Sequence, residues 1–171
     1  MAMIAQEPDA SRVRIATAAD ECELMCLCRA NHAENGIGAF AEDKVHAVFR
    51  RAFDHGRNDV GVIGVVGETV IEGSIGLIVD QPWDGDTPIL MGLWTYVLPA
   101  FRGSTNMRDL VAFARRLSDP APIGMGLPLW MGAISHRRTE AQVRLYKRQL
   151  GEPVSYGWLC ENNWSAPDVT R

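Results

Sequence analysis

Polar and apolar positions follow two different periods along the chain, and their succession predicts the order of its elements. Residues 12–16 alternate between polar and apolar side chains, which is typical of a short strand. Thr17 and Asp20 have the spacing of a capping box, so a helix is expected to begin there and to end near residues 35–36. Apolar side chains at helical spacing predict a second helix over 42–55.

The middle of the chain is rich in β-branched residues. The segments 59–67 and 70–79 are typical of the two strands of a hairpin, and 89–97 is expected to be another strand. The segment 104–117 then carries an apolar stripe at helical spacing, and Pro120 follows its expected end.

Three further elements complete the pattern. A strand is expected over 127–134, a helix over 138–150 and a last strand over 154–160. The order β-α-α-β-β-β-α-β-α-β predicts an α/β protein with a mixed sheet rather than a doubly wound parallel one.

Composition limits the class of protein. The chain has 171 residues, 47% of them hydrophobic, and a net charge of −4, which is too apolar and too weakly charged for a disordered protein. We expect one domain over 12–161, with tails at 1–11 and 162–171. The acidic balance lacks the global basic field of a typical nucleic-acid binder.

Targeting and membrane signals are absent from the pattern. No basic stretch followed by an apolar stretch opens the chain, and the longest apolar run, 60–67, is too short to cross a bilayer. A cytoplasmic protein without a membrane partner is expected.

Three cysteines lie close together, Cys22, Cys26 and Cys28, at a spacing that suits metal ligands. The segment is expected to be helical, with Cys22 and Cys26 on its inward face, and no nearby His or Cys pair completes a set of four ligands. We therefore interpret them as small apolar core residues and expect no metal site.

The segment 97–107 carries the most informative chemistry. It joins an apolar strand to an amphipathic helix, so free backbone N–H groups and the positive end of a helix dipole point outward, which suits a phosphate. Arg102 adds a fixed positive charge, and Gly103 allows a close approach of the backbone. An ordinary helix start with Ser104 as its N-cap is the alternative.

Both the element order and this junction resemble the GNAT superfamily of N-acetyltransferases. Val97, Pro99, Arg102 and Gly103 match the family pattern Val-x-Pro-x-x-Arg-Gly in order and spacing, and Leu145-Tyr146 matches a later Leu-Tyr. The resemblance extends from about residue 12 to residue 160. The stretch 32–36 is similar to acceptor-side segments of phage- or prophage-type members.

The resemblance implies a site for acetyl-CoA. Its phosphates would lie on the loop after the strand, and the strand itself would pair with pantetheine. The matching positions are Tyr96, Val97, Leu98, Arg102, Gly103, Ser104, Thr105, Asn106 and Met107. The Val97 N–H would polarise the thioester carbonyl, and Tyr146 would protonate the departing thiolate.

The chain also departs from the family pattern. Two later glycines of the phosphate loop are Thr105 and Met107 here, and both side chains crowd the expected phosphate path. Thr139 and Gln142 stand where the family has Asn and Ala. These changes leave a non-catalytic binding module on the same fold as an alternative.

A general base is missing from the strand where many relatives carry a Glu. The substitutes are Glu34 or His32 on the acceptor side, beside Asn35, or a water held by Thr95 or Ser135. A solvated Glu34 and a surface His32 are the alternatives.

Two charged regions complete the picture. Trp83 and Asp84 lie in an acidic loop over 80–86 that would attract a cationic amine, unless it is a solvated turn. A basic helix face over 137–148 would lie near the CoA end or simply face solvent.

The leading hypothesis is an acyl-CoA-dependent N-acyltransferase that moves an acetyl group from acetyl-CoA to an amine of a small molecule or a protein. The alternatives are the non-catalytic module and a phage-type enzyme that modifies nucleic-acid bases. A homodimer is expected by analogy with the family.

Overall fold

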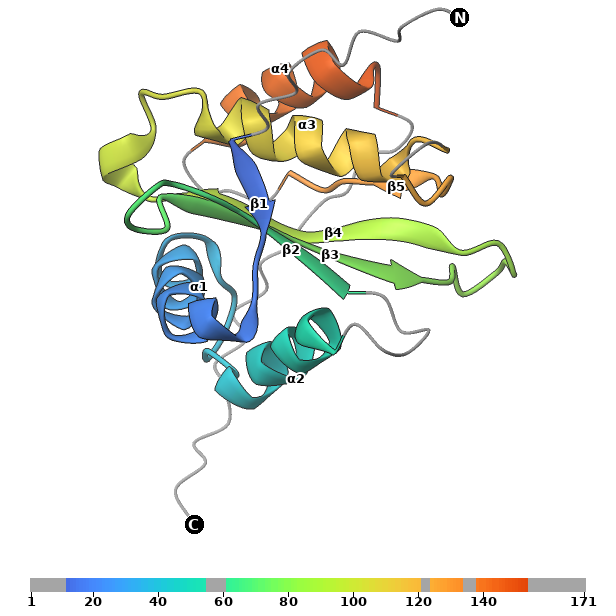
Figure 1. The fold of residues 1–171 in the computed structure, drawn as a ribbon. Helices are drawn as coiled ribbons and strands as arrows, with labels where there is room; N and C mark the ends of the chain where they lie inside the picture. Colours follow the sequence, from blue (N-terminus) through green and yellow to red (C-terminus); the bar gives the residue numbers. More distant parts are fainter. Residues whose placement is uncertain (1–11, 55–60, 121–123, 134–137, 154–171) are drawn as a thin grey trace, which may run out of the picture.

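A twisted five-stranded sheet forms the centre of the protein in the computed structural model, which describes residues 12–54, 61–120, 124–133 and 138–153 (Figure 1). The strands lie in the order β1-β2-β3-β4-β5. Their bounds are Val13–Ile15, Gly61–Val66, Gly73–Asp80, Ile89–Val97 and Leu129–Trp130. Neighbours are antiparallel except β4 and β5, which are parallel, so the sheet is mixed, as the element order predicts. The expected strand 154–160 and Ser135 lie outside the described residues.

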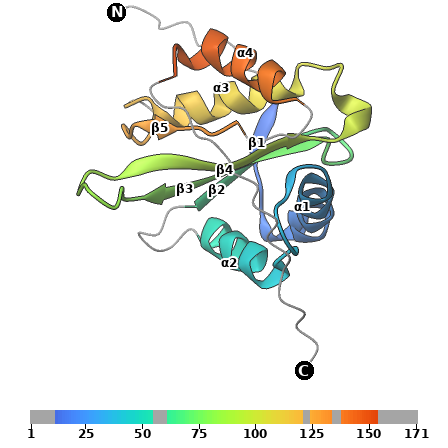
Figure 2. The ribbon, with the colours of Figure 1, turned by 180° about the vertical axis from the view of Figure 1, so that it is seen from behind.

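Helices cover both faces of the sheet. On one face lie α1, Glu21–Asn35, and α2, Glu42–Phe53. On the other face lie α3, Asn106–Ser118, and α4, Thr139–Leu150, and the opposite view shows the same layers (Figure 2). Short 3-10 turns at Ala18–Asp20 and Pro99–Phe101 precede α1 and α3. No helix in the described part of the chain is both long and apolar enough to span a bilayer.

The central strand β2 shows how the two layers share the sheet. Ile63 and Val65 belong to the core under α1 and α2, whereas Val62 and Val66 belong to the core under α3. This alternation follows from the two-residue period of a strand, and both faces are apolar because both are covered. On the α3 face, a Cβ at Gly64 would lie 2.7 Å from the Phe113 ring, so the ring packs directly on the strand.

The sheet opens between β4 and β5. These strands pair only at Leu90 with Leu129 and at Met91 with Trp130. Beyond Gly92, β4 keeps its partner β3 on one side but has no strand on the other within the described residues. A register shift at Gly76/Leu77 accompanies this departure. The unpaired edge of β4 is the feature that positions the candidate site.

Several elements differ in extent from the sequence-based expectation. The strand expected over 127–134 is paired only over two residues, because β4 and β5 diverge. The return strand expected from residue 70 begins at Gly73, because Ile71 and Glu72 complete the turn and Glu72 N–H donates to the Val66 carbonyl. The helix expected from residue 104 begins at Asn106.

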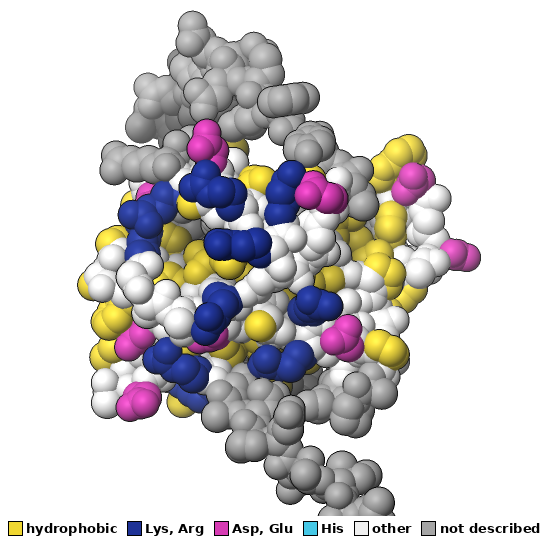
Figure 3. All heavy atoms as spheres, turned by 90° about the horizontal axis from the view of Figure 1, so that it is seen from above, with side chains coloured by type: hydrophobic (Ala, Val, Ile, Leu, Met, Phe, Trp, Pro, Cys, Tyr) yellow, Lys and Arg dark blue, Asp and Glu magenta, His cyan; other side chains and the backbone are white. Residues whose placement is uncertain are grey.

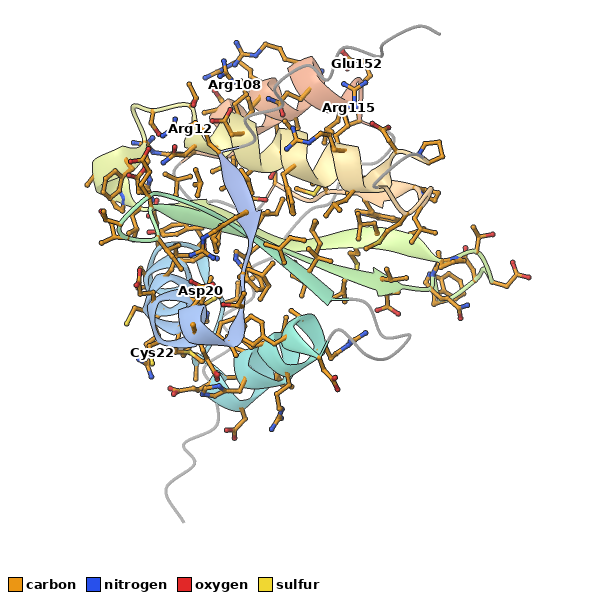
Figure 4. The ribbon with its side chains drawn as sticks, viewed as in Figure 1. Arg12, Asp20, Cys22, Arg108, Arg115 and Glu152 are labelled. Carbon is orange, nitrogen blue, oxygen red and sulfur yellow. The ribbon has the colours of Figure 1, made fainter. Side chains whose placement is uncertain are left out.

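The start of the first helix agrees with the sequence-based expectation, but its cysteines do not. Thr17 and Asp20 form the predicted capping box. The prediction that Cys22 and Cys26 point inward is wrong: both are exposed, and Figure 4 shows Cys22 on the outer side of α1. Of the three cysteines in this helix, Cys28 alone is buried, and burial raises the pKa of its thiol to about 12.

Candidate active site

Two adjoining cavities lie along the unpaired edge of β4. The first, which we call the acceptor cavity, has a volume of about 360 Å³ and lies between α1, α2 and β4. The second, which we call the arginine cavity, has a volume of about 270 Å³ and lies between β4, the β4–α3 loop and α4. Three residues line both cavities, namely Asn35, Thr95 and Gln142. We call their meeting point the junction.

The backbone of β4 turns hydrogen-bonding groups toward this opening. The Val97 carbonyl accepts a hydrogen bond of 3.0 Å from Arg102 Nε, and Leu98 N–H donates to Glu72 on the β3 side. Residues of an antiparallel pair exchange both of their backbone bonds or neither, so the Val97 N–H shares the direction of its carbonyl. By the two-residue period, Thr95 presents its backbone groups to the same side.

Arg102 and Glu34 form an ion pair in the wall of the arginine cavity. The Arg102 guanidinium donates to the Glu34 carboxylate, and each side chain is 18% exposed. The Tyr96 hydroxyl donates to the same carboxylate at 3.1 Å, and Arg102 lies 5.3 Å from the centre of the Tyr96 ring. These bonds lower the pKa of Glu34, the largest cause being Arg102. A carboxylate held in this way is a poor proton acceptor, and Arg102 is turned toward the protein.

Three further arginines, Arg108, Arg138 and Arg148, line the arginine cavity, which has Glu34 as its only carboxylate among the described residues. Figure 3 shows Lys and Arg side chains gathered on the face of the molecule seen from above, where α3 and α4 lie. Arg108 points up from α3 in Figure 4. Arginine guanidinium groups bind phosphate oxygens well, so the charge of this cavity suits a phosphorylated ligand.

The β4–α3 loop divides the predicted cofactor residues into two groups. Those that line the arginine cavity are Tyr96, Val97, Arg102, Ser104 and Met107. Those that do not line it are Leu98, Gly103, Thr105 and Asn106. Of these, Gly103 has open space around its α-carbon, so the backbone there is accessible.

Thr105 and Asn106 are engaged in holding the loop. The Thr105 hydroxyl, at the N-cap of α3, donates to Asp109 at 2.6 Å and accepts from Arg12. The fully buried Asn106 donates from Nδ2 to Glu72 at 2.6 Å. Their side chains stabilise the junction of β4 and α3.

Tyr146 lies on α4 and lines the acceptor cavity next to the junction. Its side chain is only 9% exposed, and burial raises the pKa of its phenol, an effect that the nearby Thr95 hydroxyl partly offsets. The phenol therefore stays protonated at neutral pH and can act as a proton donor.

His32 forms part of the wall of the acceptor cavity. Its Nε2 lies 3.0 Å from the Gly38 carbonyl, which can only accept, so Nε2 carries the proton in this bond. The other ring nitrogen faces the backbone at Gly36, where a Cβ would lie 2.1 Å from it. This packing fixes the ring and leaves little room for a second partner.

The acidic loop between β3 and β4 lies away from both cavities. It projects from the end of the sheet far from α1 (Figure 1), and Trp83 is 96% exposed. Neither Trp83 nor Asp84 lines the acceptor cavity or the arginine cavity. Among the described residues, no three His, Cys, Asp or Glu side chains are grouped so as to hold a metal ion.

Sequence reasoning did not assign Gln142 or Arg108 to the site. Gln142 differs from the Ala of the family pattern, and its position one turn before Tyr146 on α4 places both residues on one face. Arg108 falls one residue beyond the phosphate motif, and its direction depends on where α3 begins.

Similarity to known proteins is visible in the fold alone. No family model matches the sequence, and no curated protein is a significant match. Among solved structures, an integron cassette protein from the mobile metagenome of Cole Harbour Salt Marsh is 19% identical, with a TM-score of 0.65, and the match covers 90% of this chain and 91% of that one.

Two other similar structures are acetyltransferase-type proteins solved with ligands. AAC(6')-Iy, in complex with the bisubstrate analog CoA-S-monomethyl-acetylneamine, is 14% identical with a TM-score of 0.64, covering 88% of this chain and 96% of that one. An aminoglycoside acetyltransferase from a soil metagenomic sample, in complex with sisomicin, is 9% identical with a TM-score of 0.58, covering 90% and 94%. The chain therefore has the fold of the GNAT acetyltransferases.

Proposed function

We propose that the protein is an N-acetyltransferase that transfers the acetyl group of acetyl-CoA to the amine of a small molecule. The observation that carries this proposal is the opening between β4 and β5, with a cavity of four arginines on one side, a mainly uncharged cavity on the other and Tyr146 beside their junction. Two adjoining cavities of this kind would accommodate a long phosphorylated thioester and a separate acceptor.

The arginine cavity fits the phosphorylated end of acetyl-CoA. Arg108, Arg138 and Arg148 would hold phosphate oxygens, and the N–H groups at the start of α3 would add the positive end of its dipole. The Val97 N–H, on the open edge of β4, would bind a carbonyl. Arg102 would act through the loop, because its guanidinium already holds Glu34 and the Val97 carbonyl.

Acetyl-CoA supplies an activated acyl carbon: a C–N bond forms, the C–S bond breaks, and the leaving sulfur takes up a proton. Tyr146 would provide this proton, because its buried phenol is protonated at neutral pH. Glu34 is not required as a base in this scheme, since its carboxylate anchors Arg102. The amine nitrogen would lose its proton to water before it attacks.

The acceptor cavity fits a compact molecule. Its walls include the apolar or aromatic side chains of Phe40, Val45, Val48 and Trp94. The similar structures include proteins named or solved with aminoglycosides, which are small-molecule amines. We propose a small-molecule acceptor on this basis.

A non-catalytic binding module is the second candidate. Met107, in place of a family glycine, lines the arginine cavity and narrows the room for phosphates. Such a module would retain the fold and lose the transfer reaction.

Binding of acetyl-CoA tests the proposal. Thermal unfolding is measured with increasing acetyl-CoA, with desulfo-CoA and ATP as comparison ligands. At a hundred times its dissociation constant, a ligand stabilises a protein by about 2.7 kcal/mol, which is a clear shift in Tm. If millimolar acetyl-CoA leaves the Tm unchanged, the enzyme hypothesis is refuted. Binding without product formation over a broad amine panel would favour the binding module.

A further inference from the structure

Three buried oxygen atoms at the junction have no hydrogen-bond partner among the described residues. They are Asn35 Oδ1, Thr95 Oγ1 and Gln142 Oε1. These are the same three residues that line both cavities. A buried acceptor without a donor costs free energy, and most buried polar atoms in proteins have partners. Three at one point therefore indicate a ligand that donates several hydrogen bonds there.

The orientation of the Asn35 side chain shows which of its two polar atoms faces a ligand. Asn35 Nδ2 donates to Asn31 Oδ1 at 3.0 Å, which leaves Oδ1 on the other side of the amide. The Thr95 hydroxyl can accept or donate, whereas the amide oxygens of Asn35 and Gln142 can only accept and do not suit a thioester carbonyl, which also accepts. They suit N–H groups.

The three oxygens come from three different elements. Asn35 ends α1, Thr95 lies on β4 where it has left β5, and Gln142 lies on α4, one turn from Tyr146. Gln142 stands where the resembled family pattern has Ala, so its oxygen is a feature of this chain.

We propose that these oxygens bind the attacking nitrogen of the acceptor, a primary amine whose remaining body carries no positive charge. This inference rests on the proposed function. A primary ammonium group has three N–H donors, which matches the number of oxygens. It loses one proton to water, the neutral nitrogen forms the C–N bond as the C–S bond breaks, and the sulfur takes the Tyr146 proton. The second proton released by the nitrogen passes through water and restores the phenol.

The charge of the acceptor cavity determines which charge the rest of the acceptor molecule, beyond its primary amine, can carry. Among the described residues, Lys44 is the only Lys, Arg, Asp or Glu that lines this cavity, and its ammonium forms no ion pair with them. A second cationic group on the acceptor would lie in the same cavity as this ammonium without a carboxylate to offset it. The cavity therefore favours neutral monoamines and amino acids with a distal amine over polyamines.

The test compares two truncations on one helix. Gln142→Ala removes the junction oxygen. Gln149→Ala is the matched control. Gln149 also lies on α4 and has a buried Oε1 without a hydrogen-bond partner in the described part of the chain, but it lines neither cavity. The probes are phenethylamine, 4-aminobutyrate and spermine, each assayed at saturating acetyl-CoA. The acetyl-CoA dissociation constant is measured separately by calorimetry.

We expect Gln142→Ala to raise the KM for phenethylamine and 4-aminobutyrate at least tenfold and to change the acetyl-CoA dissociation constant less than threefold. Gln149→Ala changes neither value by more than twofold. Equal amine KM values in the two variants, or spermine as the best of the three probes, would overturn the proposal. Failure of the wild-type protein to bind acetyl-CoA would instead refute the proposed function.

Thr95→Val provides an independent variant of nearly the same shape. It removes an unpaired hydroxyl, so the protein should keep or gain thermal stability. We expect the KM for the monoamines to rise about fivefold, even though the variant is well folded. An unchanged KM would mean that the Thr95 oxygen does not bind the amine.

Discussion

The two cavities on either side of Thr95 differ in charge more than in size. The arginine cavity is lined by four arginines and one carboxylate, and that carboxylate is paired with Arg102. The acceptor cavity is lined mainly by amides, aromatic rings and aliphatic side chains, with Lys44 as its charged residue among those described.

This difference indicates that the two ligands would be selected by different forces. Charge attracts phosphates over several ångströms and tolerates imprecise placement, whereas neutral hydrogen bonds require close and directed contact. One side would therefore bind a common cosubstrate strongly, and the other would discriminate among amines by shape and by the number of donors.

The largest expected effect comes from Tyr146, which lies next to the junction in the acceptor cavity. Tyr146→Phe removes the phenolic proton but keeps the ring, and we expect the turnover number to fall about 100-fold. Affinity for acetyl-CoA should stay within twofold, measured by calorimetry. Turnover equal to that of the wild type would exclude Tyr146 as the acid.

Glu34→Gln tests whether the carboxylate in the arginine cavity stabilises the fold through its ion pair with Arg102. The variant weakens the bonds to Arg102 and Tyr96, and the free energy of unfolding at pH 7 should fall by about 2 kcal/mol. The pKa of Glu34 is lowered by Arg102 from its ordinary value of 4.5, so its stabilising contribution is present above that pH and is lost as the pH falls through the lowered value.

Urea unfolding at pH 7 and at pH 3 measures this difference. The gap between the wild type and Glu34→Gln should narrow in acid. Glu140→Gln is the control, because that side chain is 92% exposed on α4, and it should change stability little at either pH. A gap independent of pH would show that the ion pair does not stabilise the fold.

Arg148→Ala tests the cationic wall. Acetyl-CoA should bind about tenfold more weakly, which is about 1.4 kcal/mol, and the loss should shrink at high salt. Arg144→Ala, on the same helix but outside both cavities, should leave affinity unchanged. Equal losses in the two variants would point to a general effect of charge on the helix.

Lys44→Ala should have the smallest effect, because Lys44 is exposed at the rim. The KM for 4-aminobutyrate should rise about threefold, since an exposed charge pair contributes less than about 1 kcal/mol. The KM for phenethylamine, which has no carboxylate, serves as the internal control and should not change. The same shift for both amines would contradict a role for charge in this cavity.

The sequence predicts the fold well because its signals are local. The capping box at Thr17 and Asp20, the apolar stripe of α3 and the β-branched β2 all depend on residues near in sequence. The point where β4 and β5 separate is different, because it depends on contacts between distant segments and on a bulge that no local pattern marks.

The candidate site is predictable only in part for the same reason. The motif at 97–103 locates the loop, but the structure alone shows that the Arg102 guanidinium turns back to Glu34 from a distant helix. Likewise, the acidic loop around Trp83 has a composition typical of amine binding, yet the direction of the β3–β4 hairpin places it elsewhere.

The short pairing of β4 with β5 has a consequence for the order in which parts of the molecule unfold locally. Only two residues of each strand join them, and the side chains of Arg115 and Gln149 provide further links between α3 and α4. Amide hydrogens of α4 should therefore exchange with solvent by local unfolding while those of β2 and β3 remain protected. A ligand that spans the opening would join the two parts, and slower exchange in α4 would report its binding without any chemical turnover.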